Sequence, residues 1–354
     1  MFPSIQIEDP VLRDRRESIS FVIPVFNEET VVPHLIREVE RYRADHPFVE
    51  QVVVVDDGST DRTLFELKRL TAGLSGYRII SFSRNFGHQL AITAGLDYAR
   101  GDAAVILDAD LQDPLHVVTE MVECWRQGHD VAYGLRRRRR GESIVKRATA
   151  AAFYRFFRIM TDIEMPVDTG DFRLVSRPVI EAYKDLGEQK PFVRALISWL
   201  GFSQVAVPYD REERIAGAPK YTYRRLVQMA VDGLASFSDK PLRLAVRTGL
   251  AVSILTGLGG AVWAILAKYV FETAPMSGWA SLMLVIAFFG GLNLFFMGLV
   301  GSYLARVFDQ VKDRPRYIVR SEWTSEGTEG PSVGDSGVNE TVEKRLEATR
   351  LSHP

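Results

Sequence analysis

The sequence predicts an α/β fold in which an open, mostly parallel sheet is followed by a hairpin of two long apolar helices. Strand-like and helix-like segments alternate through the first half of the chain, and this spacing is typical of a parallel sheet. Two apolar runs, roughly 248–271 and 279–304, follow near the C-terminus. Each run is long enough to cross the ~30 Å hydrocarbon core of a bilayer.

Four strands are predicted in the first half, and each is followed by a helix. The strands are expected at 20–25, 52–55, 78–82 and 103–107, and the helices at 30–42, 60–70, 89–99 and 115–127. Residues 52–55 are consecutive valines, which is typical of a strand covered on both faces. Ligands of such sheets bind beyond the carboxyl ends of the strands, so the polar residues found there form the candidate site.

Polar clusters follow three of these strands and are expected to converge on one crevice. They are Asn27-Glu28, Asp56-Asp57 and Asp108-Ala109-Asp110. Two carboxylates one residue apart are costly to ionise together at the end of a buried strand, and a divalent cation relieves that repulsion. The sequence therefore predicts a Mg²⁺ or Mn²⁺ site at Asp108 and Asp110. A solvated turn leading to Asp113-Pro114 is the structural alternative.

Several further sequence patterns bear on how the site binds phosphate and metal. The segment 56–59 also suits a tight turn followed by a helix cap, which is the role expected of Gly58 and Ser59. Neither G-x-G-x-x-G nor G-x-x-x-x-G-K-[ST] occurs, so phosphate binding is expected from the metal and from basic side chains. One cysteine and six histidines form no zinc-type pattern, and His88, after Gly87, is equally compatible with a turn.

Basic and amphipathic segments follow residue 134. Residues 136–140 are consecutive arginines, and the segments near 146–163 and 223–237 place apolar side chains on one helical face. These two segments are predicted to be helices in the membrane interface, with ordinary surface helices as the alternative. Aromatic residues do not interleave with the arginines, so a phosphorylated substrate or anionic headgroups are expected there rather than nucleic acid. The segment 168–173, taken alone, suits a turn with a local ion pair.

The domain organisation follows from these segments. We expect an N-terminal extension at 1–17, a sheet domain at 18–240, a transmembrane hairpin at 241–305, a cytoplasmic segment at 306–323 and a disordered tail at 324–354. Basic residues flank the hairpin but are missing from its link, 272–278, so both chain ends are expected in the cytoplasm. A buried hairpin in a soluble core is the alternative.

The overall composition excludes few classes of protein. The 44 Lys and Arg residues balance the 45 Asp and Glu residues, so net charge does not favour any class of partner. The single cysteine, Cys124, excludes an internal disulfide framework and fits a reducing compartment.

Taken together, the motifs resemble those of glycosyltransferase family 2, and within it the polyprenyl-phosphate glycosyltransferases with a C-terminal two-helix anchor. The stretches that carry the resemblance are VIPVFNEE (22–29), VDDGSTD (55–61), SRNFG (83–87), DADLQDP (108–114), TGDFRL (169–174) and RPRY (314–317). The likeness covers about 18–323. It includes the bacterial glucosyl and aminoarabinosyl members and, more distantly, dolichol-phosphate mannose synthase. The resemblance implies a GT-A fold.

The resemblance also implies roles for individual residues. Those expected to contact the nucleotide sugar are Pro24, Phe26, Glu28, Val55, Asp57, Asp108, Ala109 and Arg136. Those expected to hold Mg²⁺ or Mn²⁺ are Asp110 and Gln112, together with Asp108, and those expected to hold the lipid phosphate are Arg136, Arg147, Arg214 and Lys220. Asp171 matches the position of the catalytic base.

Two departures from the family pattern bear on these roles. Phe26 stands where Tyr is common, which removes a hydroxyl but keeps the ring. Residues 217–221, Gly-Ala-Pro-Lys-Tyr, replace the usual Gly-x-Ser-Lys-Tyr, so Arg214 is kept beside Lys220 as a candidate for phosphate binding.

The implied reaction is inverting transfer of a sugar from a nucleotide diphosphate to a polyprenyl monophosphate, of undecaprenyl or decaprenyl type, at the cytoplasmic face of the inner membrane. Glucose and UDP are the first choice, while N-acetylhexosamine, galactose, mannose and aminoarabinose stay open. Similar proteins form tetramers, so a homo-oligomer is compatible with the sequence. The alternatives are a processive polysaccharide synthase and a non-catalytic membrane adaptor that binds nucleotide sugar. Two spans are few for the former, and its Gln-x-x-Arg-Trp motif does not occur.

Overall fold

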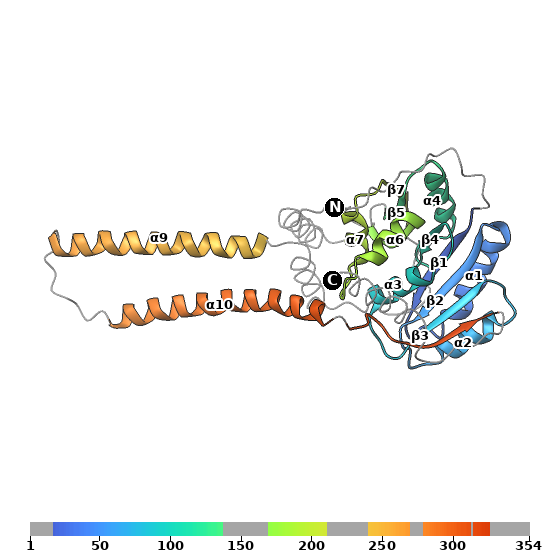
Figure 1. The fold of residues 1–354 in the computed structure, drawn as a ribbon, viewed down its shortest axis with the longest axis horizontal. Coiled ribbons are helices and arrows are strands. Elements are labelled where there is room, and N and C mark those ends of the chain that lie inside the picture. Colours follow the sequence, from blue (N-terminus) through green and yellow to red (C-terminus); the bar gives the residue numbers. More distant parts are fainter. Residues whose placement is uncertain (1–16, 137–168, 211–239, 270–278, 313, 326–354) are drawn as a thin grey trace, which may run out of the picture. The chain divides into compact units, whose positions relative to one another are not determined.

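A computed structural model describes residues 17–136, 169–210, 240–269, 279–312 and 314–325 (Figure 1). The chain divides into two compact units. One contains the sheet and comprises 1–142, 165–219 and 315–354, and the other comprises 143–164 and 220–314. The predicted interfacial helices near 146–163 and 223–237 lie outside the described residues, as do most of the N-terminal extension and nearly all of the predicted tail.

The first unit is built on an eight-stranded sheet with the order β7-β5-β6-β4-β1-β2-β3-β8. Its strands are β1 (Ile19–Val25), β2 (Val49–Asp56), β3 (Tyr77–Phe82), β4 (Ala103–Ile106), β5 (Val131–Arg136), β6 (Thr169–Ser176), β7 (Gln204–Tyr209) and β8 (Val319–Thr324). The four predicted strands are confirmed as β1 to β4, which run parallel to one another. The sequence did not predict β5 to β8, and 168–173 contributes to strand β6 rather than to an isolated turn.

Helices cover both faces of the sheet. They are α1 (Val32–Asp45), α2 (Thr63–Thr71), α3 (His88–Tyr98), α4 (His116–Arg126), α6 (Arg177–Asp185) and α7 (Val193–Trp199). Side chains of α1, α2 and α4 pack in one large apolar cluster, whereas those of α3 pack in a second cluster that includes Val53 and Val55. The four helices predicted after the first four strands are therefore confirmed, with modest shifts at their ends.

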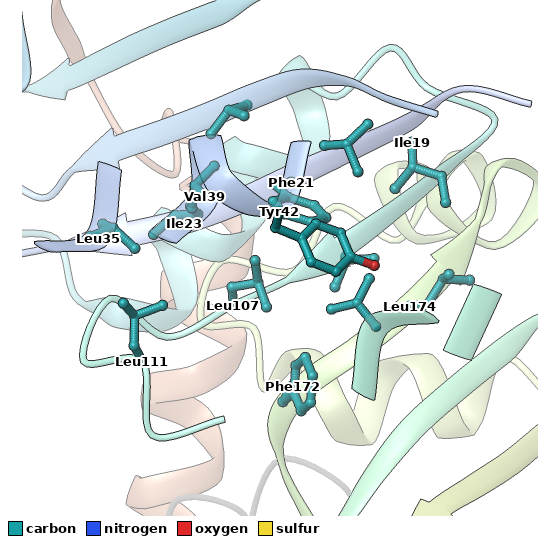
Figure 2. Close-up of a cluster of buried hydrophobic side chains, with 14 of the residues drawn as sticks. Ile19, Phe21, Ile23, Leu35, Val39, Tyr42, Leu107, Leu111, Phe172 and Leu174 are labelled. Carbon is teal, nitrogen blue, oxygen red and sulfur yellow. The ribbon is translucent and has the colours of Figure 1, made fainter. Parts of the chain in front are cut away.

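The alternation of side chains along β1 and β2 produces these two clusters. Ile19, Phe21 and Ile23 point to the side that carries Leu35 and Val39 of α1, as Figure 2 shows. Residues of one strand at even and odd positions face opposite sides of a sheet, so a strand covered on both faces must be apolar throughout. Each fully buried Val, Ile or Phe stabilises the fold by about 1.5–3 kcal/mol.

The segment after the second long helix returns to the sheet as β8. It pairs antiparallel with β3, and an ion pair of 2.5 Å joins Arg78 to Glu322. Just before β8, the ring of Tyr317 stacks on Phe82 with a centroid distance of 5.0 Å, and its hydroxyl donates to Asp97 at 2.8 Å. Residues 315–317 of the RPRY stretch are therefore part of the sheet unit.

The second unit contains two long helices, α9 (Lys240–Tyr269) and α10 (Trp279–Val311). The second predicted apolar run lies within α10, and the first lies within α9 as far as Tyr269. Among the described residues, one helical segment, Phe288–Val311, is long and apolar enough to cross a membrane, with a mean hydropathy of 1.5. This segment overlaps the second predicted span, whereas the described part of α9 yields no such segment.

The loop after β2 and the loop after β3 touch at Gly58, and this contact generates a stability prediction. Gly58 has φ +68°, and a Cβ built there would lie 2.3 Å from the carbonyl carbon of Arg84. Gly58→Ala should lower the free energy of unfolding by about 2–4 kcal/mol, because it adds left-handed strain to a backbone clash. Denaturant unfolding checks this value.

Gly73→Ala is the matched control. Gly73 also has a positive φ, +84°, but nothing lies within 4 Å of its added Cβ. The control should lose only about 1 kcal/mol, which is the strain alone. Equal losses in the two variants would show that the contact between the loops contributes nothing.

Candidate functional site

The site lies at the carboxyl edge of the parallel strands, where the β1–α1 and β2–α2 loops are tied together. The amide of Asn27 donates to Ser59 Oγ at 2.9 Å, and the amide of Thr60 donates to Asn27 Oδ1 at 2.8 Å. Asn27 has φ 52°, a conformation that Asn tolerates better than most residues. The amide of Glu28 donates to Thr63 Oγ1 at 2.8 Å. These hydrogen bonds fix the backbone conformation of Asn27 and Glu28, the first polar cluster.

The two carboxylates at the end of β2 are engaged by the protein itself. Asp56 accepts hydrogen bonds from the Ser59 amide at 3.0 Å and from the Ser81 hydroxyl at 2.8 Å. Asp57 accepts from the amides of Phe86 at 2.7 Å and Gly87 at 3.0 Å. Burial raises the pKa of Asp57, and those two amide bonds oppose the rise. Both side chains therefore hold neighbouring loops in place.

The turn after β4 presents carboxylates outward by burying the residues between them. Leu107, Ala109 and Leu111 belong to the large apolar cluster, and Figure 2 shows Leu107 and Leu111 within it. Asp108 and Asp110 alternate with them and are partly exposed. Burial raises the pKa of Asp108 to about 6, and the carboxylates of the other acidic residues nearby add to the rise. The turn therefore concentrates negative charge.

The register between β4 and β6 brings a further carboxylate to this turn. The two strands are antiparallel, with Ala103 opposite Ser176 and Ile106 opposite Arg173. Asp108 follows the last paired residue of β4 by two positions, Asp171 precedes its partner by two, and the two carboxylates interact. Like charges that face each other across strands are destabilising unless something lies between them.

His88, the first residue of α3, lies between these two carboxylates. Its Nε2 is 3.3 Å from Asp171 Oδ2 and 3.6 Å from Asp108 Oδ1. Burial lowers the pKa of His88, but the hydrogen bond to Asp171 and the charge of Asp108 outweigh that effect, so the pKa lies above its usual value. The imidazole thereby offsets part of the negative charge.

Asp171 is held from a second side by Gln89. The Gln89 amide nitrogen donates to Asp171 Oδ2 at 2.8 Å, while its oxygen accepts from the amide of Val193 at 2.9 Å. Burial alone would raise the pKa of Asp171, but the His88 hydrogen bond and the charges of Arg194 and Arg173 hold it well below its usual range. Asp171 is therefore an ionised, fixed carboxylate.

Arg136 brings positive charge to the same region from the end of β5. Its Nε donates to the Tyr209 hydroxyl at 3.1 Å, and its Nη2 lies 3.7 Å from Asp113 Oδ1. The Tyr209 hydroxyl in turn donates to Asp113. Burial would lower the pKa of Arg136, but the Tyr209 hydrogen bond and the charge of Asp113 raise it above its usual value.

Apart from Asp57, which binds the loop after β3, the structure places the predicted residues in four groups. Asp108, Asp110, Asp171 and Arg136 come together at one edge of the sheet. Those that lie buried beneath that edge are Pro24, Val55, Ala109 and Gln112, whereas Phe26 and Glu28 are partly exposed. Those that lie outside the described residues are Arg147, Arg214 and Lys220.

Sequence reasoning missed His88 and Gln89 as members of the site, and it missed the pair formed by Asp113 and Tyr209. The first two had a usable signal, because they follow β3 at the same carboxyl edge as the three polar clusters. Tyr209 ends β7, which the sequence did not predict as a strand.

The possible metal ligands at the turn after β4 fit a hard divalent cation. Asp108, Asp110 and Gln112 offer only oxygen ligands, which Mg²⁺ and Mn²⁺ prefer. Within the described residues, no group of three or more His, Cys, Asp or Glu side chains is placed to hold a metal ion.

Comparison with known proteins places this geometry in a family. The sequence model of "Glycosyl transferase family 2" matches residues 20–184. A glycosyltransferase of Bacillus subtilis (strain 168), YkcC, is 43% identical over 310 residues, which cover 87% of this chain and 95% of that protein. The chain belongs to glycosyl transferase family 2. It is therefore a glycosyltransferase.

Other family 2 relatives match over most of their length. The SfII prophage-derived bactoprenol glucosyl transferase of Shigella flexneri is 38% identical over 302 residues, which cover 85% of this chain and 97% of that protein. Among solved structures, the mannosyltransferase PcManGT from Pyrobaculum calidifontis, in complex with GDP-Man and Mn²⁺, matches with a TM-score of 0.46 at 16% identity. The match covers 86% of this chain and 88% of that one.

The raised pKa of Asp108 generates a stability prediction with a defined sign. Between the ordinary carboxyl value of about 4 and the native value of about 6, native Asp108 retains a proton that the unfolded chain releases. The contribution of Asp108 to the stability of the wild-type protein therefore falls as pH rises through this window. Asp108→Asn should be more stable than wild type at pH 8 by about 1–3 kcal/mol, and the two should converge at pH 4.

Denaturant unfolding in EDTA at the two pH values checks this prediction. Asp185→Asn, at the exposed end of α6, is the control and should not change the pH dependence. A wild-type protein whose advantage over Asp108→Asn grows with pH would contradict the electrostatic account of the turn.

Proposed function

We propose that the protein transfers glucose from UDP-glucose to a polyprenyl monophosphate with inversion at the anomeric carbon. The bond from C1 of glucose to the β-phosphate of UDP breaks while a bond from C1 to the acceptor phosphate oxygen forms. The observation that carries this proposal is the match to bactoprenol glucosyl transferases at 37–38% identity, which extends over 97–99% of their length. The carboxylate site at the end of β4 supports it.

The geometry suits direct displacement. A phosphate monoester has a second pKa near ~6, so the acceptor is mostly dianionic at pH 7 and needs no strong base. The lowered pKa of Asp171 fits a carboxylate that orients the acceptor or a basic partner better than one that removes a proton. Asp171 is proposed as part of the catalytic machinery in that orienting role.

The turn after β4 is proposed to hold Mg²⁺ or Mn²⁺ through Asp110, Gln112 and Asp108. Such an ion, when bound, would offset the charge that develops on the departing diphosphate. Burial is the main cause of the raised pKa of Asp108, and the charges of Asp113, Asp171 and Asp110 add to it. A bound cation would offset that added repulsion, which supports this assignment. Arg136, beside Asp113, is proposed to contribute positive charge to the same diphosphate.

The remaining contacts to the nucleotide sugar are proposed at the β1 and β2 ends. Phe26 and Glu28 are partly exposed there and suit direct contact with a base or ribose. Val55, like Pro24 and Ala109, is buried and suits a supporting role beneath the ligand. Asp57 is proposed to act on the nucleotide through the loop whose amides it binds.

The acceptor is proposed to approach from the membrane. The segment Phe288–Val311 of α10 supplies an apolar helix long enough to span a bilayer, and α9 is proposed as the second helix of the anchor. Arg147, Arg214 and Lys220, with Arg136, are proposed to bind the lipid phosphate. The protein would then lie at the cytoplasmic face of the inner membrane with both termini inside, as a monomer or a homo-oligomer.

Transfer of radiolabel tests the proposed function directly. Purified protein in detergent is mixed with polyprenyl phosphate, Mg²⁺ or Mn²⁺, and one radiolabelled nucleotide sugar at a time. Radioactivity that becomes extractable into chloroform with UDP-glucose, and not with GDP-mannose or UDP-N-acetylglucosamine, is the expected result. Extractable label from a different nucleotide sugar would refute glucose as the transferred sugar. Consumption of UDP-glucose without extractable label would refute polyprenyl phosphate as the acceptor.

The metal assignment makes a separate prediction. Asp110→Asn should lower transfer to lipid phosphate on the order of 10²-fold and should raise the Mg²⁺ or Mn²⁺ concentration needed for half-maximal rate. EDTA should abolish the wild-type reaction. Asp185→Asn, outside the site, should behave as wild type under both conditions. An Asp110→Asn protein with unchanged transfer would refute the metal assignment.

A further inference from the structure

We propose that His88 is a positioning residue of the sugar-transfer site, whose Nε2 holds the Asp108 and Asp171 carboxylates at a fixed separation. This inference rests on the proposed function, because it assigns the two carboxylates to the two sides of one displacement reaction. Asp108 belongs to the turn proposed to hold the metal and the donor diphosphate, and Asp171 is proposed to orient the acceptor. Neither of the motifs that contain these aspartates includes His88.

The first support is that the two carboxylates would repel each other without a donor between them. The last pair of the β4–β6 ladder is Ile106 with Arg173, so Asp108 follows that ladder by two residues and its carboxylate lies near Asp171. His88 Nε2 lies 3.3 Å from one carboxylate and 3.6 Å from the other. Either carboxylate could relieve the repulsion by rotating to another rotamer. The imidazole of His88 between the two carboxylates weakens the repulsion and therefore favours the observed rotamers.

The second support is that the backbone of His88 is itself fixed. Gly87, immediately before it, has its amide bound by Asp57, and it adopts φ +108°, so α3 begins at a defined point. The helix then packs on the sheet, with Ala91 and Ile92 fully buried. A donor at the first position of such a helix has little freedom to move.

The third support is the clamp that Gln89 makes on the far side of Asp171. Its amide nitrogen donates to the same oxygen, Oδ2, that faces His88, and its own oxygen accepts from Val193 at the start of α7. Asp171 Oδ1 is buried and makes no hydrogen bond within the described part of the chain. Two adjacent residues of α3 therefore determine the orientation of the carboxylate.

Fixed separation matters because an in-line displacement is sensitive to geometry. A misplacement of about 1 Å between reacting groups can cost on the order of 10²-fold in rate. His88→Ala should therefore lower kcat on the order of 10²-fold, while the KM values for UDP-glucose and polyprenyl phosphate change less than about threefold. A residue needed only for folding would not separate kcat from KM in this way.

Two conservative variants sharpen the test. Gln places an N–H near the position of the His Nε2, whereas Asn is shorter and places one near Nδ1. His88→Gln should recover kcat to within about tenfold of wild type, and His88→Asn should resemble His88→Ala. His129→Ala, which precedes β5 at the opposite edge of the sheet, is the matched histidine control and should leave all constants unchanged.

A double-mutant cycle with Asp171→Asn completes the experiment. If His88 acts through Asp171, the double variant His88→Ala/Asp171→Asn should be scarcely slower than Asp171→Asn alone. Additive losses, a His88→Ala kcat within threefold of wild type, or a His88→Gln enzyme as slow as His88→Ala would each overturn the inference. If His88→Ala does not fold, the comparison of the Gln and Asn variants decides.

Failure of the proposed function gives a different result. A wild-type protein that transfers no glucose to polyprenyl phosphate refutes that function whatever the variants do. The variants are then compared on the nucleotide sugar that the wild type does turn over, with the same expected order of kcat values.

Discussion

The site depends on electrostatic repulsion within a small region at the carboxyl edge of the sheet. Asp108, just beyond the end of β4, and Asp171, in β6, lie close to each other, with Asp110 and Asp113 nearby. Hydrophobic burial keeps them there, because Leu107, Ala109 and Leu111 anchor the turn in the core. The favourable free energy of core packing thus offsets the cost of gathering like charges, and the excess charge makes the edge attractive to cations and basic groups.

The loops around this edge form one connected structure rather than separate motifs. Asp57 binds the amides of Phe86 and Gly87, and the next residue, His88, contacts both Asp108 and Asp171. The loops at the ends of β2, β3 and β4 and the start of β6 are therefore linked through consecutive hydrogen bonds and ion-pair contacts. Displacement of one loop would alter the others, which is why the contact at Gly58 bears on the site as well as on stability.

The segment that follows α10 adds a second link to the same loops. Tyr317 stacks on Phe82, and Phe82 contacts Phe86 edge-on with a centroid distance of 5.6 Å. Phe86 is one of the two residues whose amides Asp57 binds. The chain that leaves the long helix thus reaches the loops of the site through three aromatic rings, in addition to its pairing with β3.

Local pattern was sufficient to predict β1 to β4, their helices and the edge of the sheet where Asn27, Asp57 and Asp108 gather. Periodicity in a single segment reports which residues are buried, and parallel strands all end at the same edge. The family motifs added Asp171 as a residue of the site. The role of Asp57 as a ligand of backbone amides was not visible, because its partners are 29 and 30 residues away.

The sequence by itself determined which residue types are available and at which strand ends they occur. Only the tertiary structure decided that Asp108 lies close to Asp171 and that His88 lies between them. The register of β4 against β6 is set by packing between segments more than 60 residues apart, with the helix α4 and strand β5 between them in the sequence. The alternation of buried side chains excludes a shift of one residue, which would turn β6 to the other face, but it allows a shift of two, so the local pattern alone does not specify the pairing.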